Sequence, residues 1–221
     1  LRMGLGPTGE ADDPILKGSM AGLHFPNAVG LAPGFDKDAQ VFAPMLRAGF
    51  GFVECGTVTP RPQAGNPRPR LFRLTEDRAV INRMGFNNQG LDAFAARLAR
   101  RGPGVVGANI GANKDTEDKA ADYVAGLRRL WGLASYFTIN ISSPNTPGLR
   151  ALQTRAALED LLGRLAEARD ALPAAGLVPI FLKVAPDLEV GEVESIVEVV
   201  VAHGLSGIMV SNTTVSRPAL G

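Results

Sequence analysis

Short apolar runs recur along the chain and alternate with polar segments that contain Gly, Pro, Asn or Thr. The runs are rich in residues that favour strands and are too short for buried helices, so we interpret them as strands covered on both faces. The six predicted strands are Ala28 to Leu31, Phe52 to Cys55, Val105 to Ile110, Phe137 to Ile141, Ile180 to Val184 and Gly207 to Val210.

Segments with helical periodicity, rich in Ala, Leu, Arg and Glu, lie between most of these strands. Repeated alternation of strand and helix predicts an α/β fold with a parallel sheet. No GxGxxG turn follows the first strand, which favours a (β/α)8 barrel of the TIM type over a dinucleotide-binding open sheet. The predicted helices are Leu91 to Arg101, Ala120 to Trp131, Ala156 to Leu172 and Val190 to His203.

The length of the chain bears on how much of such a barrel it holds. A complete barrel typically needs about 250 residues, whereas this chain has 221 and reaches Gly221 after its sixth strand. We therefore expect residues 1–221 to form one barrel domain without its last two strands, and the abrupt start, Leu1 to Pro14, to lack upstream residues. The Pro- and Arg-rich segment Thr59 to Arg73 is predicted to be an irregular loop above the barrel mouth.

Charge and cysteine content narrow the possible partners. The chain has 23 basic and 22 acidic residues without a basic stripe, which argues against nucleic acid as a partner. The single cysteine, Cys55, cannot form an internal disulfide and has no CxxC partner, so it suits a reducing compartment and is best explained as a core residue. No run of about 18 apolar residues predicts a membrane span, so any membrane contact is expected to be peripheral.

Polar residues gather where the predicted strands end, which is where barrel enzymes build their active sites. Asparagine offers both an acceptor and a donor, so several around one pocket suit a planar ring with imide edges, such as a pyrimidine or a flavin. The segments lack His and paired carboxylates, which argues against hydrolytic triads, most zinc sites and glycosidase chemistry. These segments are Pro33 to Lys37, Gly56 to Thr59, Asn109, Asn140 to Asn145, Lys183 and Ser211 to Thr214.

Each of these features also has a structural interpretation. A single Asn at a strand end commonly forms a turn, and Ser143 could be a loop residue held extended by Pro144. Lys37, between two aspartates, could belong to a solvated charge cluster. Lys183 differs because it lies inside the apolar run IFLKVAP, where a lysine must find a buried partner or face the barrel mouth.

Several segments together resemble one family. GLAPGFDKD, GTVTPRPQAGNPRPRLFR, INRMGFNNQG, NIGANKDT, NISSPNTPGLR, LKVAPD and SNTT occur in the same order and spacing as in dihydroorotate dehydrogenases, from about Gly22 to Thr214. Ser143 stands where the quinone-linked members have serine and the fumarate- or NAD-linked members have cysteine. The PRPRLFRL stretch also resembles the quinone-linked group, in which the residue matching Arg73 lies beside the quinone tunnel.

The resemblance implies a role for each matching residue. Ser143 would be the catalytic base, Lys183 would lie at the N1 and O2 edge of the flavin, and Lys37 would face both flavin and substrate. Pro33 and Ser211 depart from the usual small residue and threonine. The implied FMN contacts are Pro33, Gly34, Phe35, Asp36, Lys37, Thr57, Asn109, Asn140, Lys183 and Ser211. The implied substrate contacts are Lys37, Asn82, Arg83, Met84, Gly85, Phe86, Asn140, Asn145, Asn212 and Thr213.

The implied activity is oxidation of (S)-dihydroorotate to orotate in pyrimidine synthesis, with FMN as hydride acceptor, a membrane quinone as final acceptor and no metal. Such a protein would lie at the cytoplasmic face of the cell membrane, or on the inner mitochondrial membrane of a eukaryote, although the helical pair that docks that group on the membrane is almost wholly absent here. Three alternatives stay open: fumarate or NAD as acceptor, a barrel aldolase with Lys183 as Schiff-base lysine, and a non-catalytic fragment or binding module.

Overall fold

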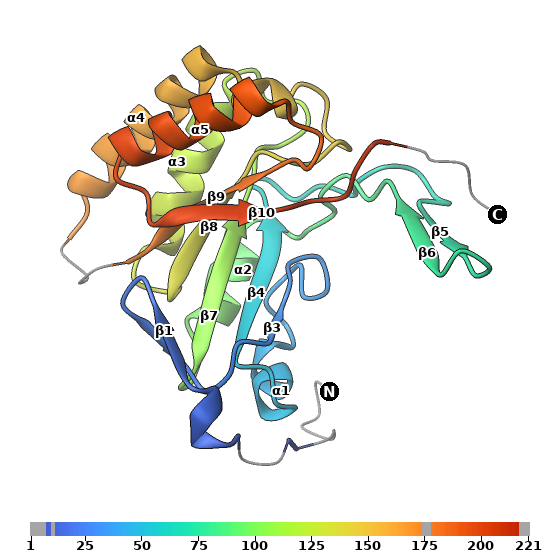
Figure 1. Ribbon diagram of the computed structural model, residues 1–221, viewed down its shortest axis with the longest axis vertical. Coiled ribbons are helices and arrows are strands. Elements are labelled where there is room, and N and C mark those ends of the chain that lie inside the picture. Colours follow the sequence, from blue (N-terminus) through green and yellow to red (C-terminus); the bar gives the residue numbers. More distant parts are fainter. Residues whose placement is uncertain (1–7, 10–11, 174–177, 217–221) are drawn as a thin grey trace.

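The computed structural model describes residues 8–9, 12–173 and 178–216, so most of the segment from Leu1 to Pro14 lies outside the described residues. Within them, six parallel strands form one curled sheet in the spatial order β3, β4, β7, β8, β9, β10 (Figure 1). Each strand pairs with the strand of this sheet that follows it in the sequence, as in a TIM-type barrel, so the fold prediction is confirmed. The strands are Gly30–Leu31, Phe52–Val58, Val105–Ile110, Tyr136–Asn140, Ile180–Val184 and Gly207–Val210.

A helix connects each strand of this sheet to the next, and the four predicted helices are confirmed to within a few residues. They are α2 (Leu91–Leu98), α3 (Lys119–Leu130), α4 (Arg155–Asp170) and α5 (Val190–Ala202). Helix α1 (Phe42–Arg47) was not predicted, because six residues that include a proline carry little periodic signal. Two short 3-10 helices, Pro14–Leu16 and Arg150–Gln153, complete the helical elements of the described chain.

Successive side chains of each strand alternate between the helix-covered outside of the sheet and the inside of the barrel. Val53, Val106 and Leu182 point outward and pack against the helices, where Phe94 and Leu127 are also fully buried. Successive strand residues face opposite sides of a sheet, so the intervening residues point into the barrel. Near the amino-terminal ends of β4, β8 and β9 these inward residues are the aromatic Phe52, Tyr136 and Phe181. Toward the carboxyl ends they are polar, which places the polar ring inside the barrel mouth.

A hairpin of β1 (Gly18–Met20) and β2 (Leu23–Phe25) was not predicted from the sequence. Its strands are only three residues long and contain Ser and His, so they lack an apolar pattern. Ala21 and Gly22 both have positive φ, as a tight two-residue hairpin turn requires. The Phe25 ring meets the Phe52 ring edge-on with centroids 5.2 Å apart, so the hairpin packs at the amino-terminal end of the sheet (Figure 1).

A second hairpin, β5 (Leu71–Leu74) and β6 (Ala79–Asn82), corrects the prediction for Thr59 to Arg73. The segment is irregular up to Arg70, but Leu71 to Arg73 lie in β5, where Leu71 pairs with Asn82 and Leu74 with Ala79. The prolines that prevent regular structure end at Pro69, and the residues beyond them can pair across the strand register. The hairpin projects beside the carboxyl ends of the sheet strands (Figure 1) and brings Asn82 to the barrel mouth. No helix in the described part of the chain is long and apolar enough to cross a bilayer.

Candidate active site at the barrel mouth

A cavity of about 360 Å³ opens at the carboxyl ends of the strands. Its wall combines amides, hydroxyls and two lysines with a few apolar groups, which is the composition expected of a small-molecule site. Leu71, which comes from the hairpin, was missed because the sequence gave no reason to fold that strand over the mouth. The lining residues are Pro33, Gly34, Lys37, Thr57, Leu71, Asn82, Met84, Gly85, Phe86, Asn140, Ser143, Asn145, Lys183, Asn212 and Thr213.

Some predicted FMN contacts lie outside this lining. The Phe35 side chain is 60% exposed. Both carboxylate oxygens of Asp36 accept backbone N–H groups, from Gln40 and Val41 at 2.7 Å each, so this side chain shapes the start of α1. Ser211 lines an adjoining, more apolar cavity of about 450 Å³, which also touches Lys183. A flavin contact at Phe35, Asp36 or Ser211 stays a prediction.

Two arginines predicted at the site also lie outside the lining. Arg83 donates through Nε and Nη2 to the Pro69 carbonyl at 3.1 and 2.8 Å, and its guanidinium lies 5.7 Å from the centre of the Phe72 ring. It therefore holds the hairpin to the preceding loop. Arg73 is exposed on β5, and its assignment to a quinone site stays a prediction.

A chain of buried amides and hydroxyls underlies the cavity. Asn109 Oδ1 accepts from Thr57 Oγ1 at 2.5 Å and from Asn140 Nδ2 at 3.1 Å. Asn140 Oδ1 in turn accepts from Ser142 Oγ at 2.7 Å, and Asn212 Nδ2 donates to that hydroxyl at 2.9 Å. Asn109 is completely buried, so it supports Thr57 and Asn140 from below rather than lining the cavity itself.

Glu54 lies at the inner end of this series of hydrogen bonds, inside the barrel, and was not predicted from the sequence. Its carboxylate accepts from Asn109 Nδ2 at 2.7 Å and from the Tyr136 hydroxyl at 3.0 Å, and the residue is 3% exposed. A carboxylate can only accept, so it fixes which way the Asn109 amide points and, through it, the Asn140 amide. Burial and then the charge of Glu54 raise the pKa of Tyr136. A lone Glu inside the run FVECG was the available signal.

Replacing Glu54 by leucine should destabilise the fold, because Asn109 Nδ2 and the Tyr136 hydroxyl would both lose their buried acceptor. Each unsatisfied group costs about 1–3 kcal/mol, so we expect a loss of roughly 2–6 kcal/mol in urea unfolding. Glu54→Gln keeps an acceptor for Asn109 and should cost less. The same leucine at exposed Glu194 on α5 is the control. Equal stability of the Glu54→Leu and Glu194→Leu proteins would refute the role given to Glu54.

The two lysines of the cavity are both poorly solvated. Burial lowers the pKa of Lys37, the positive charge of Arg70 lowers it further, and Asp38 partly opposes the shift. Burial also lowers the pKa of Lys183, with the Glu54 carboxylate opposing. Two half-buried cations in one pocket are costly unless a ligand shares their charge, so the cavity suits an anionic or electron-rich ligand.

Ser143 lies in the wall formed by the loop after β8. The residue is buried, and its Oγ accepts the backbone N–H of Asn145 at 3.2 Å. Asn145 Nδ2 reaches the Asn82 carbonyl at 3.5 Å and Asn82 Oδ1 at 3.4 Å, both at the limit of hydrogen bonding. Asn145 and Asn82 can therefore turn toward a ligand at little cost.

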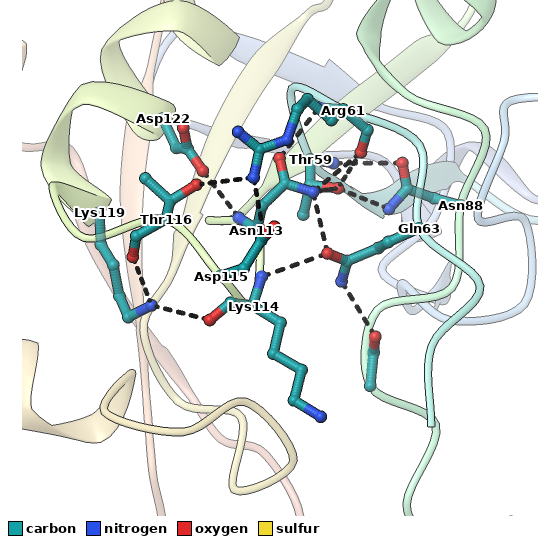
Figure 2. A network of polar contacts seen from close by, with 11 residues as sticks. Thr59, Arg61, Gln63, Asn88, Asn113, Lys114, Asp115, Thr116, Lys119 and Asp122 are labelled. Atoms are coloured by element: carbon teal, nitrogen blue, oxygen red, sulfur yellow. Dashed lines mark hydrogen bonds and ion pairs between the residues drawn. The ribbon is translucent and has the colours of Figure 1, made fainter. Parts of the chain in front are cut away.

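A second polar network, also missed from the sequence, is centred on Asn113 and Gln63 (Figure 2). Asn113 Nδ2 donates to Thr59 Oγ1 at 3.1 Å and to the Arg61 carbonyl and Gln63 Oε1 at 2.9 Å each. Gln63 Nε2 then donates to the Gly85 carbonyl at 3.0 Å. The network joins the segments after β4 and β7 to the wall of the cavity, and nothing in the local sequence pairs these residues.

Fold and site together define a (β/α) barrel protein with a small-molecule site at the carboxyl ends of its strands. A family model described as dihydroorotate dehydrogenase matches residues 15–221. The chain belongs to the dihydroorotate dehydrogenase family.

Individual relatives agree with this assignment. The chain is 56% identical over 224 residues to a Brucella anthropi protein and 59% identical over 213 residues to an Allorhizobium ampelinum protein, both named dihydroorotate dehydrogenase (quinone). These matches cover 100% and 95% of this chain but 62% and 59% of the relatives, so the chain spans about three fifths of their length.

Solved structures are also similar. Two crystal structures of DHODH from Eimeria tenella, one in complex with ferulenol and one ligand-free, superpose with TM-scores of 0.91 and 0.93 at 41% identity. Each superposition covers 98% of this chain. It covers 65% of the Eimeria chain in the ferulenol complex and 67% of the ligand-free Eimeria chain.

Proposed function

We propose that the protein oxidises (S)-dihydroorotate to orotate in pyrimidine synthesis, using bound FMN and passing the electrons to a membrane quinone. The observation that carries the proposal is that Ser143, Lys37, Lys183 and the asparagines line one cavity at the barrel mouth. Family membership and the names of the quinone-linked relatives support it.

The residues of the cavity fit a flavin. Asn140 donates to Thr57 Oγ1 at 2.8 Å and pairs in register with Lys183, so a hydroxyl, an amide and a cation lie together and match the alternating acceptors and N–H of an isoalloxazine ring. Pro33 and Gly34 bring backbone close to the same space, and Lys37 lies next to them. When bound, FMN would supply the acceptor for the hydride that leaves C6 of dihydroorotate.

Ser143 would accept the proton from C5 of dihydroorotate. A neutral hydroxyl is a weak base, so it must pass its own proton to a neighbouring group or a water chain as it accepts the C5 proton. The backbone N–H of Asn145 already donates to Ser143 Oγ. This bond orients the hydroxyl, and the hydroxyl hydrogen of Ser143 then points away from Asn145, toward another acceptor. Its burial keeps bulk water from competing for that proton.

The remaining groups would bind and orient the substrate. Lys37 would pair with the orotate carboxylate, and the low solvation of its ammonium group strengthens that pairing. Asn82, Asn145 and Asn212, with Thr213, would bind the polar edges of the pyrimidine ring. Lys183 would stabilise negative charge on the pyrimidine edge of the flavin.

Quinone as the final acceptor, and attachment to the cytoplasmic face of a membrane or to an inner mitochondrial membrane, are parts of the same proposal. They are supported by serine at position 143, by Arg73 on the projecting hairpin and by the relatives' names. A comparison of quinone, fumarate and NAD as acceptors in steady state tests this part, and turnover with fumarate or NAD alone would overturn it. Family membership favours this reaction over a Schiff-base aldolase.

Asn145→Ala should weaken orotate binding, because buried donors and acceptors of the ring would lose a partner. The expected loss is about 1–3 kcal/mol, or roughly 5- to 150-fold in Kd. Isothermal titration of the flavin-loaded full-length protein with orotate measures it. Gln40→Ala removes an amide that does not line the cavity and should leave Kd unchanged. An unaltered Kd in Asn145→Ala would remove this residue from the binding site.

A further inference from the structure

The guanidinium group of Arg150 joins the three loops that follow β8, β9 and β10. Its Nε donates to the Ser142 carbonyl at 3.0 Å, its Nη1 to Asp187 Oδ2 at 3.0 Å and its Nη2 to the Thr213 carbonyl at 3.1 Å. Each acceptor belongs to a different strand-end loop. Arginine can serve all three because its donors form a rigid planar fork, whereas a lysine ammonium is a single flexible point.

Asp187 extends the connection on the opposite side. Its carboxylate accepts from the Thr214 hydroxyl and from the Val215 N–H, so the loop after β10 is held by both Arg150 and Asp187. These hydrogen bonds, with that of Arg150, lower the pKa of Asp187. The carboxylate is therefore charged wherever the protein functions near neutral pH.

The ion pair is better shielded than those on the helix surface. The side chains of Arg150 and Asp187 are 23% and 22% exposed, whereas those of Arg155 and Glu198 are 53% and 65% exposed. Exposed pairs contribute little because water and salt screen them. Arg150 and Asp187 are thus the pair better able to hold loops in place.

The acceptors of Arg150 are next to residues of the cavity. The Ser142 carbonyl belongs to the peptide bond that precedes Ser143, and the Thr213 carbonyl belongs to a lining residue. Arg150 itself does not line the cavity. Its hydrogen bonds fix the backbone of two adjoining walls, one carrying Ser143 and the other carrying Asn212 and Thr213, and Asn212 Nδ2 joins these walls by donating to Ser142 Oγ at 2.9 Å.

We propose that Arg150, with Asp187, is a positioning residue that holds Ser143 in a fixed position relative to the ring-binding residues Asn212 and Thr213. The proposal rests on the proposed function, since it assigns Arg150 to the same site. If it holds, Arg150→Lys should loosen both walls at once, although neither wall residue has been changed. A residue that serves only global stability would not produce this paired, local effect.

The test compares Arg150→Lys and Asp187→Asn with Arg155→Lys in the flavin-loaded full-length protein. Arg155 also makes two ion pairs, but with Glu159 and Glu198 on α4 and α5, away from the cavity. Without ligand, hydrogen exchange of residues 142–146 and 211–215 should accelerate about tenfold in the first two variants and remain unchanged in the third. Orotate Kd should rise about tenfold, and flavin reduction at saturating dihydroorotate should also slow.

The readouts separate the positioning role from the reaction itself. If the unmodified protein fails to bind orotate, the proposed function is wrong, and the exchange data still decide whether Arg150 holds the two walls. If it binds orotate and Arg150→Lys matches Arg155→Lys in exchange, affinity and rate, the positioning role is overturned. Asp187→Asn provides a second variant if Arg150→Lys does not fold.

Discussion

Replacing Ser143 by alanine should slow reduction of the flavin by dihydroorotate about 10²- to 10⁴-fold, the usual contribution of a positioned general base. The hydroxyl is buried in the cavity wall and held by the Asn145 N–H, so its loss removes the proton acceptor without opening the site. Orotate affinity should therefore stay nearly unchanged. Anaerobic stopped-flow at the flavin absorbance measures the rate, and titration with orotate measures the affinity.

Ser142→Ala is the matched contrast for this experiment. Its hydroxyl bonds Asn140 and Asn212 rather than facing the reacting atoms, so its loss should weaken orotate binding and slow the reaction less than Ser143→Ala. An unchanged rate of flavin reduction in Ser143→Ala would remove Ser143 from the role of base.

The second large effect is expected from Lys183→Met, which should slow flavin reduction about 10²- to 10³-fold, as when one preorganised donor to a developing charge is removed. The same variant should be more stable than the unmodified protein at neutral pH, because a poorly solvated cation is replaced by an apolar chain of similar length. A slower but more stable protein cannot be explained by unfolding. Lys114→Met, at an exposed lysine, should alter neither property.

The pH dependence of flavin reduction follows from the direction in which burial shifts the pKa of Lys183. Burial lowers the pKa of Lys183 below the ordinary lysine value of 10.5, so Lys183 loses its charge at a lower pH than an exposed lysine would. The rate of flavin reduction should therefore fall as the pH rises through this lowered pKa. The unfolded chain binds the proton more tightly, so this group's contribution to stability rises with pH between the folded pKa and 10.5.

Glu54→Gln provides the check, because the Glu54 charge raises the pKa of Lys183. The alkaline fall in rate should move to lower pH in that variant. Lys37 also has a lowered pKa, so the fall belongs to Lys183 only if Lys183→Met abolishes it. Persistence of the same fall in Lys183→Met would assign it to another group.

The strands of the sheet could be predicted from sequence because each is a short run of mainly apolar residues, as is typical of parallel strands covered on both faces. The two hairpins could not. In β1 and β2 a favourable turn outweighs poor strand composition, and in β5 the preceding prolines conceal the point at which pairing begins.

The cavity residues could be predicted because a parallel barrel brings the carboxyl ends of its strands together. Asn109 was also predicted at the site, but its buried partners Glu54 and Tyr136 were not, since the three residues come from β7, β4 and β8 and meet only in three dimensions. Arg150 lies outside every predicted strand and helix, so its three acceptors could be found only in the structure.

The central claim is most directly tested by an anaerobic visible spectrum of the purified full-length protein, followed by addition of dihydroorotate. We expect a yellow protein whose oxidised flavin band bleaches as dihydroorotate is added. A flavin band that persists in the presence of excess dihydroorotate would contradict it, because the cofactor would then be present without the proposed substrate.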